Sequence, residues 1–262
     1  MKKFLFVIFI FIAFCNCVCA RNISKKEEYN KTINNTSSYI EKYKSSSENI
    51  EIDNMIELMD KAAEADKSGN YVMALRYYDK MLEISPTNAP IYALRGLIYL
   101  YEYNANTYAL SDFNSAIKYT SKPVASYYQY RGIARMRLED IDGALSDTAK
   151  AIEINNKNSE SNAELYCIRA LLHSRKGDEK LAIDDATVSI KLKSKNPRAF
   201  YYRALAKMGY AVKLKSVTML DSALQDLNYS KEQYLEQGNM DGYQEVMETY
   251  KRYQNAARLL KK

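Results

Sequence analysis

The chain has 262 residues, of which 47% are hydrophobic and 27% charged, so it is not of the disordered class and can bury a core. Its 38 basic and 32 acidic residues give a formal charge of +6, a mild excess that does not predict the concentrated basic face that nucleic-acid binding needs. Tyrosine is unusually common, with 24 residues and no tryptophan, and we expect most of these rings to serve packing.

The first 20 residues have the layout of a cleavable secretory signal. Positive Lys2 and Lys3 precede an unbroken apolar run from Phe4 to Phe14, and small residues stand three and one before Arg21. The run is shorter than the roughly 20 residues that span a bilayer. We therefore expect export to a bacterial periplasm or cell envelope. Cysteines in this segment leave two alternatives open, a lipid-anchored form and an uncleaved anchor.

If the signal is removed, Cys167 is the one cysteine left, and an intramolecular disulfide is excluded. Cys167 lies among apolar neighbours, so we expect it to be a small buried residue. Residues 21–54 are rich in Asn, Ser, Lys and Glu without a sustained period, which predicts a disordered polar spacer.

A pattern that ends in arginine and a small residue recurs four times at about the spacing of a helical hairpin. Its copies are Tyr92-Ala93-Leu94-Arg95-Gly96, Tyr128-Gln129-Tyr130-Arg131-Gly132, Tyr166-Cys167-Ile168-Arg169-Ala170 and Tyr201-Tyr202-Arg203-Ala204. A second pattern opens on alanine, with copies at Ala109-Leu110-Ser111-Asp112, Ala144-Leu145-Ser146-Asp147, Ala182-Ile183-Asp184-Asp185 and Ala223-Leu224-Gln225-Asp226, and a less typical one at Ala74-Leu75-Arg76-Tyr77. Repetition at this period predicts a solenoid of stacked helix pairs.

The two patterns resemble the first and second helices of the tetratricopeptide repeat, a helix-turn-helix unit of about 34 residues. The resemblance covers residues 55–234 in five copies, and its most typical stretch runs from Gly69 to Asn88. It implies an all-α, right-handed solenoid. Apolar residues at helical spacing after Gly238 predict a capping helix within residues 235–262.

The small residues of the first pattern have a physical reason, because they let the two helices of a pair approach closely. Successive second-helix alanines are 35, 35, 38 and 41 residues apart. We expect the additional residues to lie in loops at 104–107, 159–162 and 209–217. The last of these is long enough to change the packing of the fifth pair.

The resemblance implies that the arginine before each small residue and the aspartate three after each alanine face the seam between helices. Four ion pairs are then expected, Arg95 with Asp112, Arg131 with Asp147, Arg169 with Asp185, and Arg203 with Asp226. An arginine guanidinium fits a carboxylate in a bidentate manner, so we expect these pairs to be structural.

The resemblance also implies a concave inner wall made by the first helices. Its candidate binding residues are Tyr101, Gln129, Tyr130, Ile133, Arg137, Leu171, Arg175 and Tyr201. Aromatic and aliphatic groups with a few arginines suit a protein or peptide partner, either acidic or helical. The alternative is that several of these side chains only pack against neighbouring first helices.

Nothing in the sequence indicates catalysis, a cofactor or a metal site. His173 is the only histidine, and it stands six residues from Cys167, about 240° around a helix, so the two cannot act as base and nucleophile on one face. The sequence therefore predicts an exported, noncatalytic scaffold that binds a protein or peptide, and contacts a membrane only through a lipid anchor or uncleaved signal. Two alternatives stay open, an envelope-assembly or pilus-biogenesis lipoprotein and an accessory subunit that binds carbohydrate or wall polymer.

Overall fold

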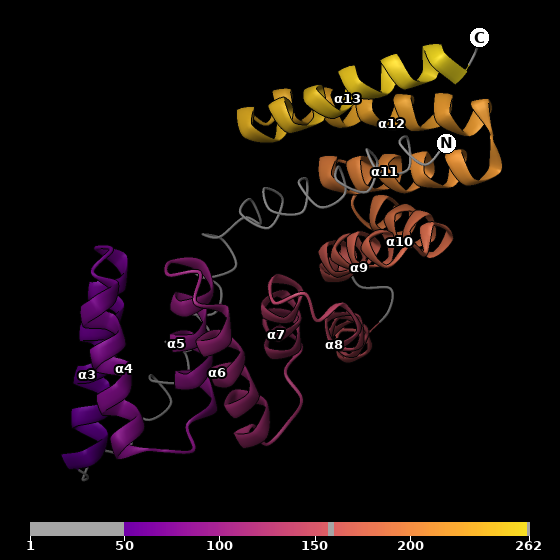
Figure 1. Cartoon of the computed structure of the whole chain (residues 1–262). Helices are drawn as coiled ribbons and strands as arrows, with labels where there is room; N and C mark the ends of the chain where they lie inside the picture. Colours follow the sequence, from indigo (N-terminus) through magenta and orange to yellow (C-terminus); the bar gives the residue numbers. More distant parts are fainter. Residues whose placement is uncertain (1–49, 157–159, 261–262) are drawn as a thin grey trace. The chain divides into compact units, whose positions relative to one another are not determined.

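The computed structural model describes residues 50–156 and 160–260, and every regular element in these ranges is helical. The predicted signal and most of the predicted spacer lie outside the described residues. The α-helices are α3 (Ile50–Lys67), α4 (Tyr71–Ile84), α5 (Ala89–Tyr101), α6 (Asn106–Tyr119), α7 (Ala125–Arg137), α8 (Ile141–Ile154), α9 (Ala163–Lys176), α10 (Glu179–Leu192), α11 (Pro197–Leu214), α12 (Val217–Glu236) and α13 (Met240–Leu260) (Figure 1). They divide into two compact units, one ending at Asp140 and the other beginning at Ile141.

The first unit contains α3 to α7. Helices α3 and α4 form one hairpin and α5 and α6 another, and α4 contacts α5 while α6 contacts α7 (Figure 1). Side chains of the first hairpin, such as Tyr78 and Met81, pack with Ile91, Leu94 and Ile98 of α5 in one hydrophobic cluster. This arrangement buries the apolar stripe of each helix against the next hairpin.

Gly96 shows why the small position of the first pattern is needed. A Cβ atom at Gly96 would lie 3.1 Å from Cε1 of Phe113 and 3.2 Å from Cβ of Asp112. Phe113 is 0% exposed and has little room to move. The glycine therefore permits the close approach of α5 and α6 that the sequence predicts.

The second unit contains α8 to α13. Helix α9 pairs with α10, α11 pairs with α12, and α13 packs on α12 (Figure 1). The small residues at the close approaches are all 0% exposed, namely Ala170, Ala182, Ala204 and Ala223. At the start of α13, Gly242 lies against the ring of Tyr234 on α12, and Val246 one turn later is 0% exposed.

Short polar side chains begin several helices. Asn70, Asn88 and Ser216 accept hydrogen bonds from the backbone N–H groups of Met73, Ile91 and Met219, respectively. Such caps satisfy donors that have no partner inside the helix.

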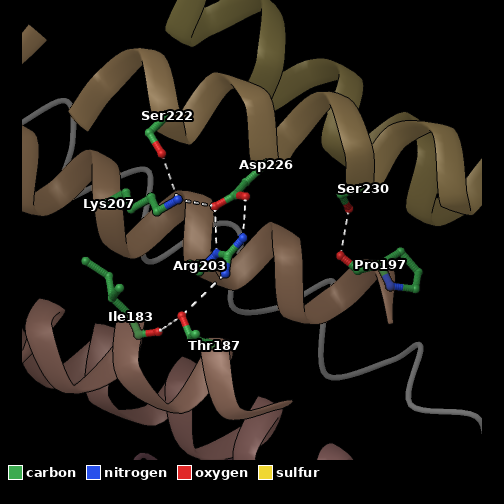
Figure 2. Close-up of polar contacts among 8 residues, drawn as sticks. All are labelled: Ile183, Thr187, Pro197, Arg203, Lys207, Ser222, Asp226 and Ser230. Carbon is green, nitrogen blue, oxygen red and sulfur yellow. Dashed lines mark hydrogen bonds and ion pairs between the residues drawn. The ribbon is translucent and has the colours of Figure 1, made fainter. Parts of the chain in front are cut away.

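Buried serines tie second helices to the starts of first helices in the second unit. The Ser189 hydroxyl donates to the carbonyl of Ala163, and the Ser230 hydroxyl to the carbonyl of Pro197 (Figure 2). Asn196 occupies the cap position before Pro197, but its side chain donates to the Ser189 hydroxyl and does not cap α11. These bonds satisfy polar groups that burial would otherwise leave unpaired.

One loop prediction is wrong. The additional residues expected in a loop at 209–217 extend α11, which continues through Gly209 to Leu214. Lys215 then takes a left-handed conformation with φ of 52°, and α12 begins at Val217. Gly209 lies within the helix and permits a close contact there, since a Cβ atom at this position would lie 3.1 Å from Cγ of Glu179.

Candidate interaction surface

Three of the four expected ion pairs are present as bidentate contacts within single units. Arg95 donates from Nε and Nη2 to the carboxylate of Asp112 at 2.9 and 2.6 Å. The corresponding distances are 2.7 and 2.6 Å from Arg169 to Asp185 and 2.8 and 2.7 Å from Arg203 to Asp226 (Figure 2). The two members of the fourth expected pair, Arg131 and Asp147, belong to different units, so this pair stays a prediction.

Each of these arginines also lies on an aromatic ring three residues earlier in its own helix. The guanidinium carbon is 5.0 to 5.5 Å from the ring centroid in the pairs Arg95 with Tyr92, Arg131 with Tyr128, Arg169 with Tyr166, and Arg203 with Phe200. Cation–π contact and the carboxylate together fix the orientation of the guanidinium. This role was not predicted from the sequence, although an aromatic residue stands three positions before the arginine in every copy.

The arginines further reach back to the second helix of the preceding repeat. Arg95 donates to Asp79 at 2.7 Å, Arg131 to Asn114 at 3.0 Å and Arg203 to Thr187 at 3.4 Å. Asp79, Asn114 and Thr187 each stand five residues after the alanine of the second pattern. Arg169 makes no such contact, since the residue at that position is Ala149, whose side chain has no acceptor. Arg95, Arg131 and Arg203 therefore join repeats, and we assign all four arginines to the framework.

Arg137, expected to contact a partner, is held by the first unit itself. Its Nη1 atom donates to the backbone carbonyl of Leu100 near the end of α5 and lies 3.4 Å from Oδ1 of Asn104. Its guanidinium carbon is 5.4 Å from the ring centroid of Tyr101. Burial lowers the pKa of Arg137. The side chain thus caps α5 from α7, and only part of it faces outward.

Three candidate binding residues on α7 are buried. Gln129, Tyr130 and Ile133 are 9%, 1% and 0% exposed. The Tyr130 ring stacks on Phe113 at a centroid distance of 5.7 Å and meets the edge of Tyr101 at 6.4 Å. The expectation that these three side chains form a binding surface is corrected accordingly, because close helix approach turns them into core.

The second unit gives a similar outcome for α9 and α11. Leu171 is 8% exposed and Tyr201 is 1% exposed. The Tyr201 hydroxyl is 3.1 Å from the hydroxyl of Thr249 on α13, so the carboxyl-terminal helix covers it. Of the candidates in this unit only Arg175, in the last turn of α9, is partly exposed.

His173 and Cys167 both lie inside the second unit. Nε2 of His173 is 3.7 Å from the Asp185 carboxylate, and burial lowers the pKa of the imidazole. Cys167 is 0% exposed, and burial raises the pKa of its thiol. A buried thiol with a raised pKa is a poor nucleophile. Across the two described ranges, no group of three or more His, Cys, Asp or Glu side chains gathers as a metal ion would require.

No protein-family model matches the chain. Among curated proteins, RNA polymerase II-associated protein 3 of Xenopus tropicalis is 34% identical over 123 residues, which are 45% of this chain and 18% of that protein. Serine/threonine-protein phosphatase 5 of Homo sapiens is 25% identical over 134 residues, which are 51% of this chain and 26% of that protein. The chain thus spans about a fifth to a quarter of the length of these relatives.

Solved structures cover more of the chain. The MamA protein superposes with a TM-score of 0.60 at 20% identity, covering 71% of this chain and 94% of that one. YrrB, described as a TPR protein with an unusual peptide-binding site, gives 0.57 at 19% identity over 72% and 88% of the two chains. A tetratricopeptide repeat protein of Parabacteroides merdae gives 0.57 at 17% identity over 75% and 78%.

The fold is that of tetratricopeptide-repeat proteins. This confirms the all-helical repeat architecture that the arginine and alanine patterns predict. At these sequence identities the likeness establishes the fold and does not identify a ligand. In residues 50–156 and 160–260, no helix is both long and apolar enough to cross a membrane.

Proposed function

We propose that this chain is an exported, noncatalytic scaffold that binds a protein or peptide partner through the first helices of its tetratricopeptide repeats. The observation that carries the proposal is the repeat fold itself. In it the recurring arginine–aspartate pairs belong to the framework, while side chains at the ends of α5, α7 and α9 stay partly exposed. YrrB, a structural neighbour, is described as having a peptide-binding site.

The accessible part of the candidate surface is small and basic. In the first unit it is the pair Tyr101 and Arg137, in which the ring lies under the guanidinium, and in the second unit it is Arg175. A rigid aromatic ring beside a cation suits an acidic or carboxylate-bearing segment, since both groups are already ordered before binding. An acidic peptide is therefore the proposed partner of the first unit.

Crosslinked affinity purification from native cells tests this surface. Tyr101→Ala and Arg175→Gln, each alone, should remove partner proteins that the unaltered chain captures. Tyr108→Ala is a matched control, because Tyr108 is a tyrosine of the neighbouring α6 and is 66% exposed. If both variants retain every protein that the control retains, the first helices do not carry the interaction.

Export rests on Lys2, Lys3 and the apolar run from Phe4 to Phe14. Mass spectrometry of the mature chain from fractionated cells should find a new amino terminus at Arg21. An acylated cysteine at position 15, 17 or 19 would instead support the lipoprotein alternative. A full-length chain in the cytoplasmic fraction would contradict export.

A further inference from the structure

Asp66, near the end of α3, is a buried carboxylate in a position that neighbouring repeats fill with apolar side chains. It is 5% exposed, and its Oδ2 atom has no hydrogen-bond partner. Counted from the arginine position of each repeat, which is Lys61 in the first copy, the equivalent residues are Leu100, Met136, Ser174 and Met208. The three apolar ones are 0%, 2% and 0% exposed, and none of the four is charged. Packing therefore does not require a charge at this position.

The groups that face Asp66 offer no compensating positive charge. Tyr71 and Tyr78 interact with it from α4, and Glu102 does so from the position that follows α5. No ion pair of Asp66 or Glu102 exists among the described residues. Burial, with a contribution from the Glu102 charge, raises the pKa of Asp66 to about 7. An isolated buried carboxylate is costly to ionise, and a like charge nearby adds to that cost.

The position of Asp66 connects this cost to the docking of the first hairpin. Helices α3 and α4 share one hydrophobic cluster with α5, in which Ile91, Leu94 and Ile98 lie under Met59, Tyr78 and Met81 of the hairpin. When the hairpin is docked, the unpaired Oδ2 atom of Asp66 is closed to solvent. Glu102, the residue after α5, is among the groups that act on Asp66, so movement of the hairpin away from α5 removes that charge and returns the carboxylate to water.

We propose that the α3–α4 hairpin is a proton-controlled cover over the apolar face of α5. A protonated Asp66 is tolerated in its buried position and the hairpin stays docked. An ionised Asp66 favours the opened hairpin, in which the carboxylate is hydrated and Ile91, Leu94 and Ile98 become accessible. The ligand that we infer for the Asp66 carboxylate is a proton. Oδ2 is closed to solvent, so a larger cation could reach it only after the hairpin had opened.

Linkage fixes the direction of the effect. Burial raises the pKa of Asp66 to about 7 in the docked state, and hydration in the opened state should return it toward its ordinary value of 3.8. The docked hairpin is therefore most stable relative to the opened one below about pH 4, and this stability decreases as the pH rises toward 7. The opening constant should increase by up to tenfold per pH unit across this window, because one proton is released, and should level off above pH 7.

Hydrogen exchange of the α3 and α4 amides in the full chain, corrected for the intrinsic pH dependence of exchange, measures this opening constant between pH 5 and pH 8. Asp66→Leu restores the apolar residue of the next repeat, and Asp66→Asn keeps the shape of the side chain. Both should give an opening constant that does not change with pH. Asp60→Asn is the matched control, since Asp60 is an exposed carboxylate on the same helix, and it should behave like the unaltered chain.

Glu102→Gln provides a second readout, because removal of its charge lowers the pKa of docked Asp66. The opening constant should then level off at a lower pH and rise by a smaller factor in total. An opening constant of the unaltered chain that is flat from pH 5 to pH 8 would overturn the proposal. So would a pH dependence that persists in Asp66→Leu, even if Asp66→Asn fails to fold.

Discussion

Gly242→Ala should strongly destabilise the attachment of the carboxyl-terminal helix. A Cβ atom at Gly242 would lie 2.6 Å from Cδ1 and Cε1 and 2.8 Å from Cζ of Tyr234. Tyr234 is 6% exposed, so its ring cannot swing into solvent without leaving the core between α12 and α13. Overpacking of this kind costs about 1 to 3 kcal/mol. Contacts of 2.6 to 2.8 Å put this site in the upper part of that range, about 2 to 3 kcal/mol. Because alanine regains at most about 1 kcal/mol of helix propensity, we expect a net loss of about 1 to 2 kcal/mol.

Gly209→Ala is the matched control within the same unit. There a Cβ atom would lie 3.1 Å from Cγ of Glu179, part of a flexible side chain that can shift. The gain in helix propensity then offsets the contact, and we expect a change within about 0.5 kcal/mol of zero. Both substitutions bring the same gain in helix propensity, so the difference in stability between the two variants measures the steric clash at Gly242.

Native-state hydrogen exchange of α12 and α13 reports the free energy of local opening, which a global melting curve of two units does not isolate. The amides of α13 should lose protection in Gly242→Ala and keep it in Gly209→Ala. Combining Gly242→Ala with Tyr234→Leu should recover part of the loss, since the clash partner is gone. Equal protection of α13 in both alanine variants would refute the packing argument.

Three further outcomes are expected. Asp226→Ala should lower the free energy of unfolding by about 2 to 3 kcal/mol in urea titrations, because the half-buried cations Arg203 and Lys207 lose a shared, buried carboxylate. Asp79→Ala, which breaks a pair with an exposed carboxylate, should cost at most about 1 kcal/mol. Similar losses in the two variants would show that burial does not decide the contribution of these pairs. Arg137→Met should increase amide exchange at the end of α5, at a cost of about 1 to 2 kcal/mol, since the Leu100 carbonyl loses its donor, and unchanged exchange there would remove the capping role. Cys167 should resist thiol reagents at neutral pH until the protein unfolds, and rapid labelling of the native chain would contradict its burial.

The repeat architecture was predictable from the sequence because its signals are local and occur several times. An arginine before a small residue, and an aspartate after an alanine, place their side chains in the same seam in every hairpin, so Arg95, Arg169 and Arg203 find the expected carboxylates. The same regularity exposes exceptions, such as Ala149 where other repeats have an acceptor.

The candidate surface was harder to predict because accessibility depends on neighbours that the pattern does not contain. From helical spacing alone, Ile133 and Tyr130 are expected on the exposed inner face of the first helices. Close packing of α5, α6 and α7 buries them instead. Tyr201 is covered by α13 through Thr249, a residue 48 positions later in the chain. Gly209 was misread for another reason, since glycine suits both a loop and a tight contact inside a helix.

The backward reach of the arginines has a mechanical consequence. A guanidinium that is hydrogen-bonded both within its own repeat and to the preceding one can transmit force across the junction. Arg95 makes such a contact from α5 to α4, and Arg203 makes one from α11 to α10. At the junction of α8 and α9, Ala149 stands at the position of that acceptor, and Arg169 lacks this link. Tension along the second unit would then concentrate at that junction, and the unit would yield there before it yields at the junction of α10 and α11.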